Sequence, residues 1–345
     1  MSQTLPSSPH VAIVGATGAV GVELLDCLTR RDFPLASLRL LASPRSAGRT
    51  MAYRGQELPV EVLTPESFAG VDIALFSAGG SISRDFASAA VQAGAVVVDN
   101  SSAFRMNPDV PLVIPEVNPG DALRHQGIVA NPNCSTIQMV MALKPLHDRF
   151  GVKRVVVATY QSVSGAGKEG MDELWAQSRA MYVNDPVTAQ QFTKPIAFNC
   201  IPHIDTFMED GSTKEEWKMA VETRKILGGE ILVHATCVRV PVFIGHAEAV
   251  TVEFERPLTA GDARNLLRDA PGVTVMDTRE DGGYMTPADC AGEDAVYVSR
   301  VRKDPTVPNG LSFWCVSDNL RKGAALNAVQ IAETLVAQGL MRRAA

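Results

Sequence analysis

The chain has 345 residues, of which 46% are hydrophobic, and its formal net charge is −6. This length is enough for two domains of ordinary size, and the apolar content allows each to have its own core. The sequence contains no basic run and no alternation of basic and aromatic residues, so nucleic-acid binding is not expected.

The sequence carries no recognisable targeting or membrane segment. Residues 1–9 are polar and lack a basic stretch followed by an apolar one, so no signal peptide is expected. The longest apolar candidate, residues 232–252, is interrupted by His234, Arg239 and Pro241, and a bilayer span needs about 20 apolar residues. We therefore expect a cytoplasmic protein without membrane contact.

The N-terminal part alternates short apolar runs with helical patterns. Residues 10–14 form an apolar run that ends at Gly15, and Val20, Leu24 and Leu28 then recur at helical spacing. Further strands are predicted over residues 38–42, 73–76, 96–98 and 128–130, and a helix over residues 82–93 that Gly94 terminates. This alternation predicts a Rossmann-type, doubly wound parallel sheet over residues 1–132.

After about residue 132 the pattern changes to α+β with a mixed or antiparallel sheet. Strands are predicted over residues 153–159, 232–240, 247–254 and 311–317, and helices over residues 137–150, over 168–181, from a cap at residues 212–213 to residue 227, and over 320–340. Ser212 with Glu215, or Thr213 with Glu216, could form a capping box before the third of these helices. We expect a second domain over residues 133–318, with residues 319–345 completing the first. Residues 182–197 receive no assignment.

A glycine-rich loop, residues 15–21, joins the first predicted strand to the first helix. Glycines let a pyrophosphate approach the backbone, and the free N–H groups at the helix start bind anions. The spacing differs from the common Gly-x-Gly-x-x-Gly pattern, and an ordinary tight turn is the alternative. The strand–turn–helix context favours a dinucleotide site. Its cofactor-binding candidates are Gly15, Thr17, Gly18, Ala19 and Val20.

The end of the second predicted strand indicates which dinucleotide is bound. An acidic residue there usually holds the ribose 2′-hydroxyl of NAD, but residues 43–48 contain no carboxylate. Ser43, Arg45 and Ser46 instead offer two hydroxyls and a guanidinium, which suit a 2′-phosphate. The loop therefore predicts NADP as the cofactor, with a solvated Arg45 on a polar loop as the alternative.

Cys134 differs from the other five cysteines by its position. The six cysteines are widely spaced without a Cys-x-x-Cys pair, so neither a disulfide framework nor a metal site is expected. Cys134 lies in residues 131–136, which follow the predicted strand of residues 128–130 and precede a predicted helix. The partial positive charge at a helix N-terminus favours the thiolate. Asn133 and nearby N–H groups could stabilise an oxyanion. The remaining cysteines are interpreted as buried structural thiols: Cys27, Cys200, Cys237, Cys290 and Cys315.

Other polar segments in the second half have two readings each. His246 follows a glycine and could serve as the base that a thiol nucleophile needs, or it could be structural. Residues 161–168 form a second glycine-rich loop that could contact phosphate or could be a simple turn. Glu215 and Lys218 share a helix face, and by themselves they predict a solvated ion pair.

Five segments taken together resemble the aspartate-semialdehyde dehydrogenase family. In chain order they are residues 15–21, 131–136, 161–167, 215–219, and 239–242 with His246. The resemblance runs from Val11 to the C-terminal helix, and the chain is similar to the shorter bacterial branch. It implies that Cys134 is the nucleophile, His246 the general acid/base and Gln161 an orienting residue.

The resemblance also implies binding residues. Arg239 is expected to hold the substrate α-carboxylate and Glu215 its amino group. The implied phosphate-binding residues are Arg105, Asn133 and Lys218, and the implied cofactor contacts beyond the glycine loop are Ser164, Gly165 and Asn319.

The implied reaction is the NADPH-dependent reductive dephosphorylation of L-aspartyl-4-phosphate to L-aspartate-4-semialdehyde through a Cys134 thioester. Such a reaction belongs to lysine, threonine, methionine and isoleucine biosynthesis, and relatives pair through the second domain, which implies a homodimer. The alternatives are an N-acetyl-glutamyl-phosphate reductase, a catalytically silent NADP-binding paralogue and a redox-sensing cysteine protein. Asn133 and the spacing of Arg239 and His246 favour the aspartyl enzyme, and the retained Cys134, Gln161 and His246 argue against a silent one.

Overall fold

A seven-stranded sheet dominates the first part of the computed structural model, which describes residues 3–4, 7–339 and 341–342. Its strands are β2 (His10–Val14), β3 (Ser37–Ala42), β4 (Thr50–Tyr53), β5 (Gln56–Val62), β6 (Ile73–Phe76), β7 (Val96–Asp99) and β8 (Ile128–Ala130). They lie in the order β4-β5-β3-β2-β6-β7-β8, and all neighbours are parallel except β4 and β5. Because the order reverses between β2 and β6, a ligand crevice is expected at the carboxyl ends of these strands.

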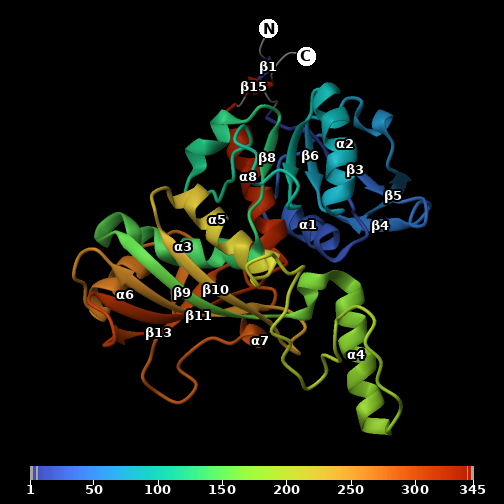
Figure 1. The fold of residues 1–345 in the computed structure, drawn as a ribbon. Coiled ribbons are helices and arrows are strands. Elements are labelled where there is room, and N and C mark those ends of the chain that lie inside the picture. Colours follow the sequence, from blue (N-terminus) through green and yellow to red (C-terminus); the bar gives the residue numbers. More distant parts are fainter. Residues whose placement is uncertain (1–2, 5–6, 340, 343–345) are drawn as a thin grey trace. The chain divides into compact units, whose positions relative to one another are not determined.

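Helices cover both faces of this sheet (Figure 1). They are α1 (Ala19–Arg30), α2 (Gly80–Gln92) and α8 (Leu326–Ala337). Successive strand residues point to opposite faces: Val11 and Ile13 join the core formed with α1 and α8, whereas Ala12 and Val14 join the core formed with α2. The predicted doubly wound parallel sheet is confirmed.

The predicted strands of the first part agree with the structure to within one residue, but the hairpin of β4 and β5 has no counterpart among them. Val60 is the one buried residue of β5, so the strand shows no apolar alternation. Arg54 and Gly55 form its turn with positive φ angles of 47° and 79°. Three 3-10 helices, η1 (Pro65–Phe68), η2 (Pro119–Arg124) and η3 (Val163–Ala166), and a terminal pair, β1 (Gln3–Thr4) with β15 (Met341–Arg342), complete the smaller elements.

A six-stranded mixed sheet forms the second part of the protein. Its strands are β9 (Val152–Gln161), β10 (Leu232–Arg239), β11 (His246–Phe254), β12 (Val273–Val275), β13 (Val296–Asp304) and β14 (Gly310–Ser317), in the order β10-β9-β11-β14-β13-β12. The outer pairs β10–β9 and β12–β13 are parallel and the inner pairs antiparallel. The predicted mixed sheet is confirmed, although β12 and β13 have no counterpart among the predicted strands.

Three helices cover one face of the six-stranded sheet, and much of the other face is open. The helices of this part are α3 (Cys134–Phe150), α4 (Gly167–Val183), α5 (Lys214–Leu227), α6 (Ala260–Arg268) and α7 (Pro287–Cys290). Among them α3, α5 and α6 contact the strands on the covered face. The short α7 contacts β14 from the other side, where Cys290 packs with Ala247 and Val316. On the opposite side Tyr160 and Leu232 are 39% and 58% exposed. Their neighbours there include Trp314, whose ring lies 5.5 Å from that of Tyr160, and Ala249. We call these four residues the open sheet face.

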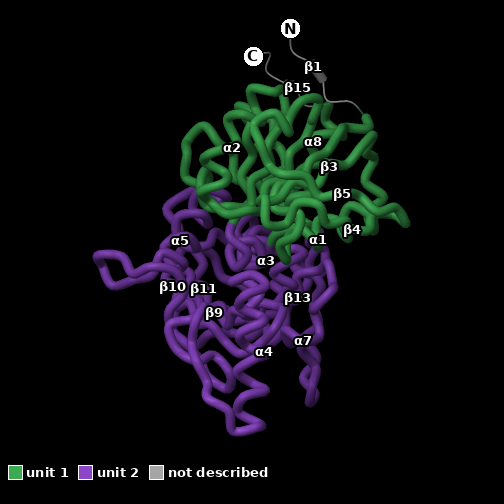
Figure 2. The backbone as a smooth tube through the Cα atoms, turned by 90° about the vertical axis from the view of Figure 1, so that its right-hand side faces the viewer, with its two compact units in different colours: residues 1–132, 324–345 green, residues 133–323 purple. Residues whose placement is uncertain are grey.

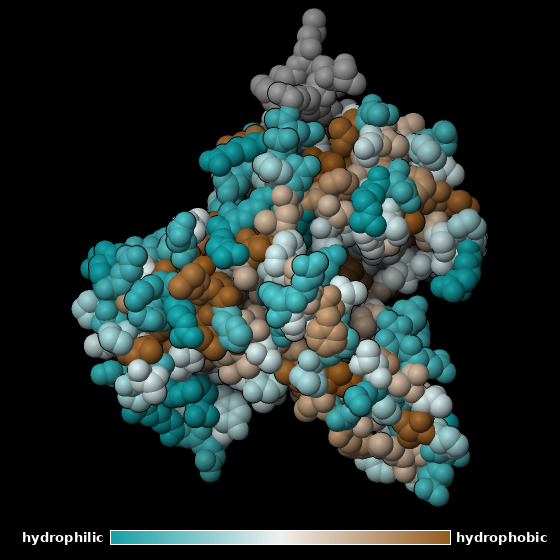
Figure 3. Space-filling view, viewed as in Figure 1, coloured by the Kyte–Doolittle hydropathy of each residue, from teal (hydrophilic) through white to brown (hydrophobic). Residues whose placement is uncertain are grey.

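Of residues 182–197, which the sequence left unassigned, the first two end α4 and the rest run back along it. The Gln177 side chain donates to the carbonyl of Thr188 and accepts from the N–H groups of Ile196 and Ala197. Figure 1 shows α4 extending away from the six-stranded sheet, and Figure 3 shows hydrophobic and hydrophilic residues mixed on this segment. The exposed Trp175 and Tyr182 belong to its apolar surface.

The predicted helix over residues 320–340 is wrong in its first part. Residues Arg321–Ala325 form a π-helix, α8 begins only at Leu326, and Leu340 lies outside the described residues. Asp318 Oδ1 accepts the N–H groups of Leu320 and Arg321 at the start of this turn. A wide turn and an α-helix place apolar residues at similar spacing, so the pattern alone did not separate them.

The chain separates into two compact units, residues 1–132 with 324–345 and residues 133–323 (Figure 2). Residues 319–323, expected above to complete the first domain, lie in the second unit because Asn319 bonds to Ser162, Ser164 and Gly245 there. Within the described residues, no helix has the length and apolar character needed to cross a membrane.

Candidate active site

Backbone contacts require two of the three glycines in the loop of residues 15–21. Gly15 has φ +89°, and a Cβ there would lie 3.0 Å from Ala78 N. A Cβ on Gly21 would lie 2.3 Å from the carbonyl oxygen of Gly15. Gly18 is open apart from that same oxygen at 3.4 Å. Space is therefore left beside Gly18, where α1 begins and its first N–H groups have no helical partner.

The loop after β3 touches the glycine loop. Thr17 Oγ1 donates to Ser46 Oγ at 3.3 Å, and Ser43 and Arg45 are exposed beside it. The described residues thus provide adjoining groups for a pyrophosphate and for a ribose 2′-phosphate. This cradle fits a dinucleotide, since a Cβ on Gly18 would meet only the Gly15 carbonyl oxygen, which leaves room beside the first N–H groups of α1.

Arg105, expected to bind phosphate, lies in the first unit and is buried. Its guanidinium donates to the carbonyl oxygens of Asn131 at 2.9 Å and Asn100 at 2.8 Å. These residues follow β8 and β7, so the arginine holds the carboxyl ends of two neighbouring strands.

Asn133 caps the helix that begins with Cys134. Its Oδ1 accepts the N–H groups of Ser135 at 3.0 Å and Thr136 at 3.2 Å. The predicted position of Cys134 at a helix N-terminus is confirmed, and the thiol is partly exposed. Such a position favours the thiolate, because the first N–H groups of a helix carry partial positive charge.

The other cysteines are mostly buried. Burial raises the pKa of Cys290 to about 12, and it also raises the pKa values of the Cys237 and Cys315 thiols. Cys27 is buried as well. Cys200 was expected to be buried and is exposed, because it lies in a loop outside the helices and strands.

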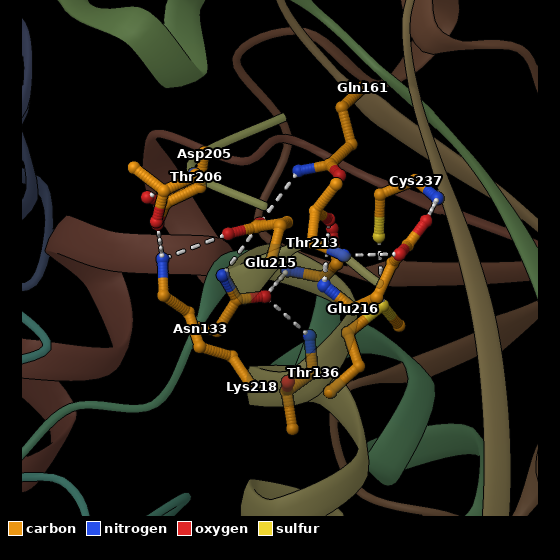
Figure 4. Close-up of polar contacts among 12 residues, drawn as sticks. Asn133, Thr136, Gln161, Asp205, Thr206, Thr213, Glu215, Glu216, Lys218 and Cys237 are labelled. Atoms are coloured by element: carbon orange, nitrogen blue, oxygen red, sulfur yellow. Dashed lines mark hydrogen bonds and ion pairs between the residues drawn. The ribbon is translucent and has the colours of Figure 1, made fainter. Parts of the chain in front are cut away.

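Glu215 is the centre of a buried polar network in the second unit (Figure 4). Its Oε1 accepts from Asn133 Nδ2 at 2.8 Å and from Gln161 Nε2 at 3.1 Å. Thr159 Oγ1 in turn donates to Gln161 Oε1 at 3.0 Å, which fixes the orientation of that amide. The residue at the helix cap and the residue at the end of β9 therefore meet on one carboxylate.

Lys218 supplies the counter-charge. Its ammonium donates to Glu215 Oε2 at 3.1 Å and to Asp205 Oδ2 at 2.6 Å. Burial alone raises the pKa of Glu215, but Lys218 and the amides of Asn133 and Gln161 bring it down to about 2. Burial lowers the pKa of Lys218, yet Glu215 and Asp205 raise it above its usual value. Both side chains are charged at neutral pH, and the solvated ion pair expected from the sequence alone is instead buried.

The helix α5 begins as one of the two proposed capping boxes requires. Thr213 Oγ1 accepts from the Glu216 N–H, and Glu216 accepts from the Thr213 N–H, so the alternative with Ser212 is wrong. The same helix carries Glu222, which is buried and whose Oε2 accepts the Asn133 N–H at 2.6 Å. Glu215 and Glu222 thus hold the side chain and the backbone of the helix cap.

His246 is fully buried, and its tautomer is set by the backbone. The Ser162 N–H donates to His246 Nδ1 at 3.1 Å, so Nδ1 is unprotonated and Nε2 carries the proton. Burial and the charge of Arg239 lower the pKa of His246 to about 3, so the ring is neutral at pH 7. Among the described residues Nε2 has no hydrogen-bond partner, which leaves an N–H donor at this position.

Gly165 brings Arg239 and His246 together. A Cβ on Gly165 would lie 2.8 Å from Arg239 Nη1 and 3.3 Å from His246 Nε2. Arg239 Nη1 donates to the Ser162 carbonyl at 2.7 Å. Burial lowers the pKa of Arg239, and the charges of Glu215 and Cys134 oppose that shift. The second glycine-rich loop therefore packs against the guanidinium and the imidazole.

Asn319 ties this loop to the segment before His246. Its Oδ1 accepts from Ser162 Oγ, Ser164 Oγ and the Gly245 N–H, at 3.0, 3.1 and 2.9 Å. Gly323 packs directly against Cys134, since a Cβ on Gly323 would lie 2.8 Å from Cys134 Cβ.

The structure adds polar residues that the sequence did not single out. Ser162, Glu222 and Asp205 contact predicted site residues directly. Ser162 lies in the second glycine-rich loop but had no role of its own, and Glu222 and Asp205 belong to no predicted motif. Within the described residues, no group of three His, Cys, Asp or Glu side chains is arranged to hold a metal ion.

Comparison with known proteins finds a matching family model for each of the two units. Residues 10–125 match the family model "Semialdehyde dehydrogenase, NAD binding domain", and residues 143–322 match "Semialdehyde dehydrogenase, dimerisation domain". The fold and the site thus define a protein of the semialdehyde dehydrogenase class.

Individual relatives narrow this class. Aspartate-semialdehyde dehydrogenase of Aquifex aeolicus (strain VF5) is 54% identical over 337 residues, which cover 96% of this chain and 99% of the relative. The crystal structure of aspartate semialdehyde dehydrogenase II from Vibrio cholerae, complexed with ASA, has a TM-score of 0.93 at 49% identity and covers 96% and 98% of the two chains. The Candida albicans enzyme with NADP has a TM-score of 0.76 at 26% identity, with 96% and 99% covered. The chain belongs to the aspartate-semialdehyde dehydrogenase family.

Proposed function

We propose that this protein reduces L-aspartyl-4-phosphate to L-aspartate-4-semialdehyde with NADPH, releasing phosphate, and that it catalyses the reverse reaction. The observation that carries the proposal is the buried network in which Glu215, Lys218 and Asn133 meet at the start of the Cys134 helix. The desolvation penalty of burying opposite charges can exceed their mutual attraction, so the pair is weakly explained by stability alone. A phosphorylated amino acid carries both signs of charge and needs both in its site.

The unused hydrogen-bonding capacity of these residues matches the substrate. A carboxylate has about four acceptor sites, of which the contacts described occupy three on Glu215. The fourth would accept from the substrate amino group. The Arg239 guanidinium has further N–H groups beyond the one donated to Ser162, and a planar fork suits the α-carboxylate.

The phosphate is assigned to donors with a proton to spare. The Lys218 ammonium has three N–H bonds, two of which go to Glu215 and Asp205. The amide of Asn133 donates one of its two to Glu215. On this ground we assign Lys218 and Asn133 to the phosphate group, and we add Arg105 because the family resemblance implies it.

In the first step, the Cys134 thiolate attacks the acyl carbon of the substrate. A carbon–sulfur bond forms, the carbon–oxygen bond to phosphate breaks, and phosphate leaves with that electron pair. Gln161, whose amide is held by Thr159 and Glu215, orients the acyl group of the resulting thioester. No proton on sulfur is required.

NADPH, when bound, supplies the hydride that reduces the thioester. His246 donates its Nε2–H to the oxygen as that oxygen becomes negative, in the manner of a neutral imidazole that polarises a carbonyl. The carbon–sulfur bond then breaks, the aldehyde forms, and Cys134 is regenerated as the thiolate. His246 is thus a hydrogen-bond donor in this direction, since accepting a proton at Nδ1 would require breaking the bond from the Ser162 N–H.

We assign the cofactor to the glycine loop and the loop after β3. Gly15, Thr17, Gly18, Ala19 and Val20 would hold the pyrophosphate, and Ser43, Arg45 and Ser46 the 2′-phosphate. Ser164, Gly165 and Asn319, which lie beside His246 and Ser162, would contact the nicotinamide side. The contacts with the pyrophosphate and the 2′-phosphate would then lie before residue 132, and those with the nicotinamide after it.

We further propose a homodimer formed through the open sheet face. Tyr160 and Leu232 are apolar residues exposed on a wide sheet surface, and such surfaces commonly mark protein interfaces. Sedimentation equilibrium of the wild type should give twice the chain mass, and Leu232→Asp should weaken this association. A monomeric wild type would exclude the dimer.

The site depends on a reduced thiol, and none of the six cysteines, all within the described residues, forms a disulfide bond. A reducing compartment keeps thiols in this state, so we assign the protein to the cytoplasm.

A coupled test separates this function from its alternatives. The protein is mixed with aspartate semialdehyde, phosphate and NADP, and NADPH is followed by absorbance; the assay is repeated with N-acetylglutamate semialdehyde. We expect signal with the first substrate and a dependence on phosphate. No signal with the first substrate and a strong signal with the second would overturn the substrate assignment. Cys134→Ala should abolish turnover while NADPH binding, followed by fluorescence, stays nearly unchanged.

A further inference from the structure

A buried hydrogen bond connects the helix of Cys134 with the strands beside His246. Ser317 Oγ donates to Gln138 Oε1 at 2.6 Å, and both residues have no exposed surface. Gln138 follows Cys134 by four residues in α3, so the two lie on neighbouring turns of the same helix side. Ser317 in β14 lies directly opposite His246 in β11.

We propose that Gln138 and Ser317 are positioning residues that set the Cys134 thiol relative to the His246 imidazole. This inference rests on the function proposed above. Neither residue is assigned a contact with substrate or cofactor; the pair acts through the elements that carry the nucleophile and the imidazole.

The physical reason is the directionality of a hydrogen bond. The side of α3 that carries Gln138 is otherwise largely apolar, with Met141 and Ala142, three and four positions further on, among its buried residues. Apolar packing is non-directional and tolerates a small rotation or slide of a helix, whereas a hydrogen bond weakens steeply when its angle changes. A glutamine at this position therefore specifies how α3 sits on β11 and β14.

A second contact at the same residue supports this reading. Cys315 Sγ, two residues before Ser317, donates to the Gln138 carbonyl at 3.5 Å. The Gln138 amide also approaches Glu248, which lies opposite Cys315 and is fully buried. Backbone and side chain of Gln138 are thus both held by the sheet, one helical turn beyond the thiol.

The test compares two single variants, Gln138→Met and Ser317→Ala, with the double variant and with Ser299→Ala. Ser299 is the matched control, since it is a fully buried serine of the same sheet whose hydroxyl accepts a main-chain N–H, that of Met285, at 3.3 Å. The readouts are kcat and KM for aspartate semialdehyde with saturating NADP and phosphate, together with the thermal unfolding midpoint.

We expect each single variant to lower kcat about 10- to 100-fold, since a misplacement of about 1 Å can cost that much. KM should change less than about twofold, because the substrate-binding residues are untouched. The double variant should be no slower than the slower single one, since both remove the same bond. Ser299→Ala should lose thermal stability but keep kcat within about twofold.

Two results would overturn the proposal while leaving the function intact, provided that the wild type is active. In the first, both single variants have the same kcat as Ser299→Ala. In the second, the losses in kcat of the two single variants add in the double variant. An inactive wild type would instead contradict the proposed function itself. If Gln138→Met does not fold, Ser317→Ala alone decides the matter by its kcat relative to Ser299→Ala.

Discussion

In the proposed cofactor site, the loop of residues 15–21, backbone groups form the surface, whereas side chains from separate elements form the proposed substrate site around Glu215. The glycine loop is one contiguous segment, and its geometry follows from contacts such as that of Gly21 with the Gly15 carbonyl. The Glu215 network joins residues that are 54 and 82 positions apart in the chain. A site built from backbone groups can therefore be recognised in the sequence as a motif, while a site built from distant side chains is recognised only in the folded structure.

This difference predicts that a substitution can impair one site and leave ligand binding at the other unchanged. Glu215→Gln removes the charge that faces Lys218 and weakens the hold on Asn133 and Gln161. A hydrogen bond to a charged group contributes about 1.5–3 kcal/mol, so kcat/KM for aspartate semialdehyde should fall about 100-fold at the upper end. The NADPH Kd, measured by fluorescence titration, should remain within about twofold of the wild type. A comparable loss of NADPH affinity in Glu215→Gln would contradict the independence of the two sites.

The Glu215 carboxylate also predicts how activity depends on pH. Because the pKa of Glu215 is about 2, it stays ionised throughout the range in which activity is measured. The wild-type profile of kcat/KM should therefore show no inflection attributable to Glu215 above pH 4.

The glycines offer a matched pair within the backbone site. In Gly21→Ala the new Cβ meets main-chain oxygens of Gly15 and Ala16, and overpacking of this kind costs about 1–3 kcal/mol. The thermal midpoint and NADPH binding should both fall. Gly18→Ala meets only an ordinary contact and has a compatible φ of −77°, so its midpoint should be unchanged while NADPH affinity falls about tenfold. Equal midpoints for both variants would contradict the packing argument.

Arg45→Ala is expected to have a smaller effect. Arg45 is exposed, and an exposed ion pair contributes about 1 kcal/mol at most. The preference for NADP over NAD, taken as a ratio of kcat/KM values, should fall about fivefold, with no change in the kinetics for NAD. An unchanged ratio would assign the 2′-phosphate to other groups.

Glu248→Gln should affect catalysis least of these changes and should act mainly on stability. Burial raises the pKa of Glu248 well above its usual range, and the Gln138 amide offsets only part of this. The folded state then holds a proton that the unfolded state loses above about pH 4.3. The wild type therefore loses stability as pH rises, by up to about 1.4 kcal/mol per pH unit. The variant carries no such group, so its advantage in urea unfolding should grow from pH 5 to pH 8. A difference independent of pH would mean that the carboxyl is ionised in the folded protein.

Much of the first unit could be predicted from the sequence. Buried parallel strands are short apolar runs bounded by turns, which is why residues 73–76 and 128–130 were assigned with their observed bounds. Elements with few buried residues, such as β5, lack this signal. The π-helix after Asn319 has no sequence signature of its own.

The second site shows what sequence cannot supply. Local spacing placed Glu215 and Lys218 on one helix face but gave no sign that Asn133, Gln161 and Asp205 would converge on them. The roles of Glu215, Lys218 and Gln161 came from the family resemblance rather than from a physical pattern, and Asp205 had no assigned role. The tautomer of His246 depends on a backbone N–H 84 positions away, which no local pattern encodes.

The most direct measurement of the central claim is the mass of the acylated enzyme. The protein is mixed with aspartate semialdehyde and NADP without phosphate, so that reversal of the proposed reduction leaves the thioester in place. After acid quench and proteolysis, the peptide that contains Cys134 should carry the mass of an aspartyl group, with about one NADPH formed per chain. NADPH formation without added mass on that peptide, or with the mass on another cysteine, would contradict the proposed role of Cys134.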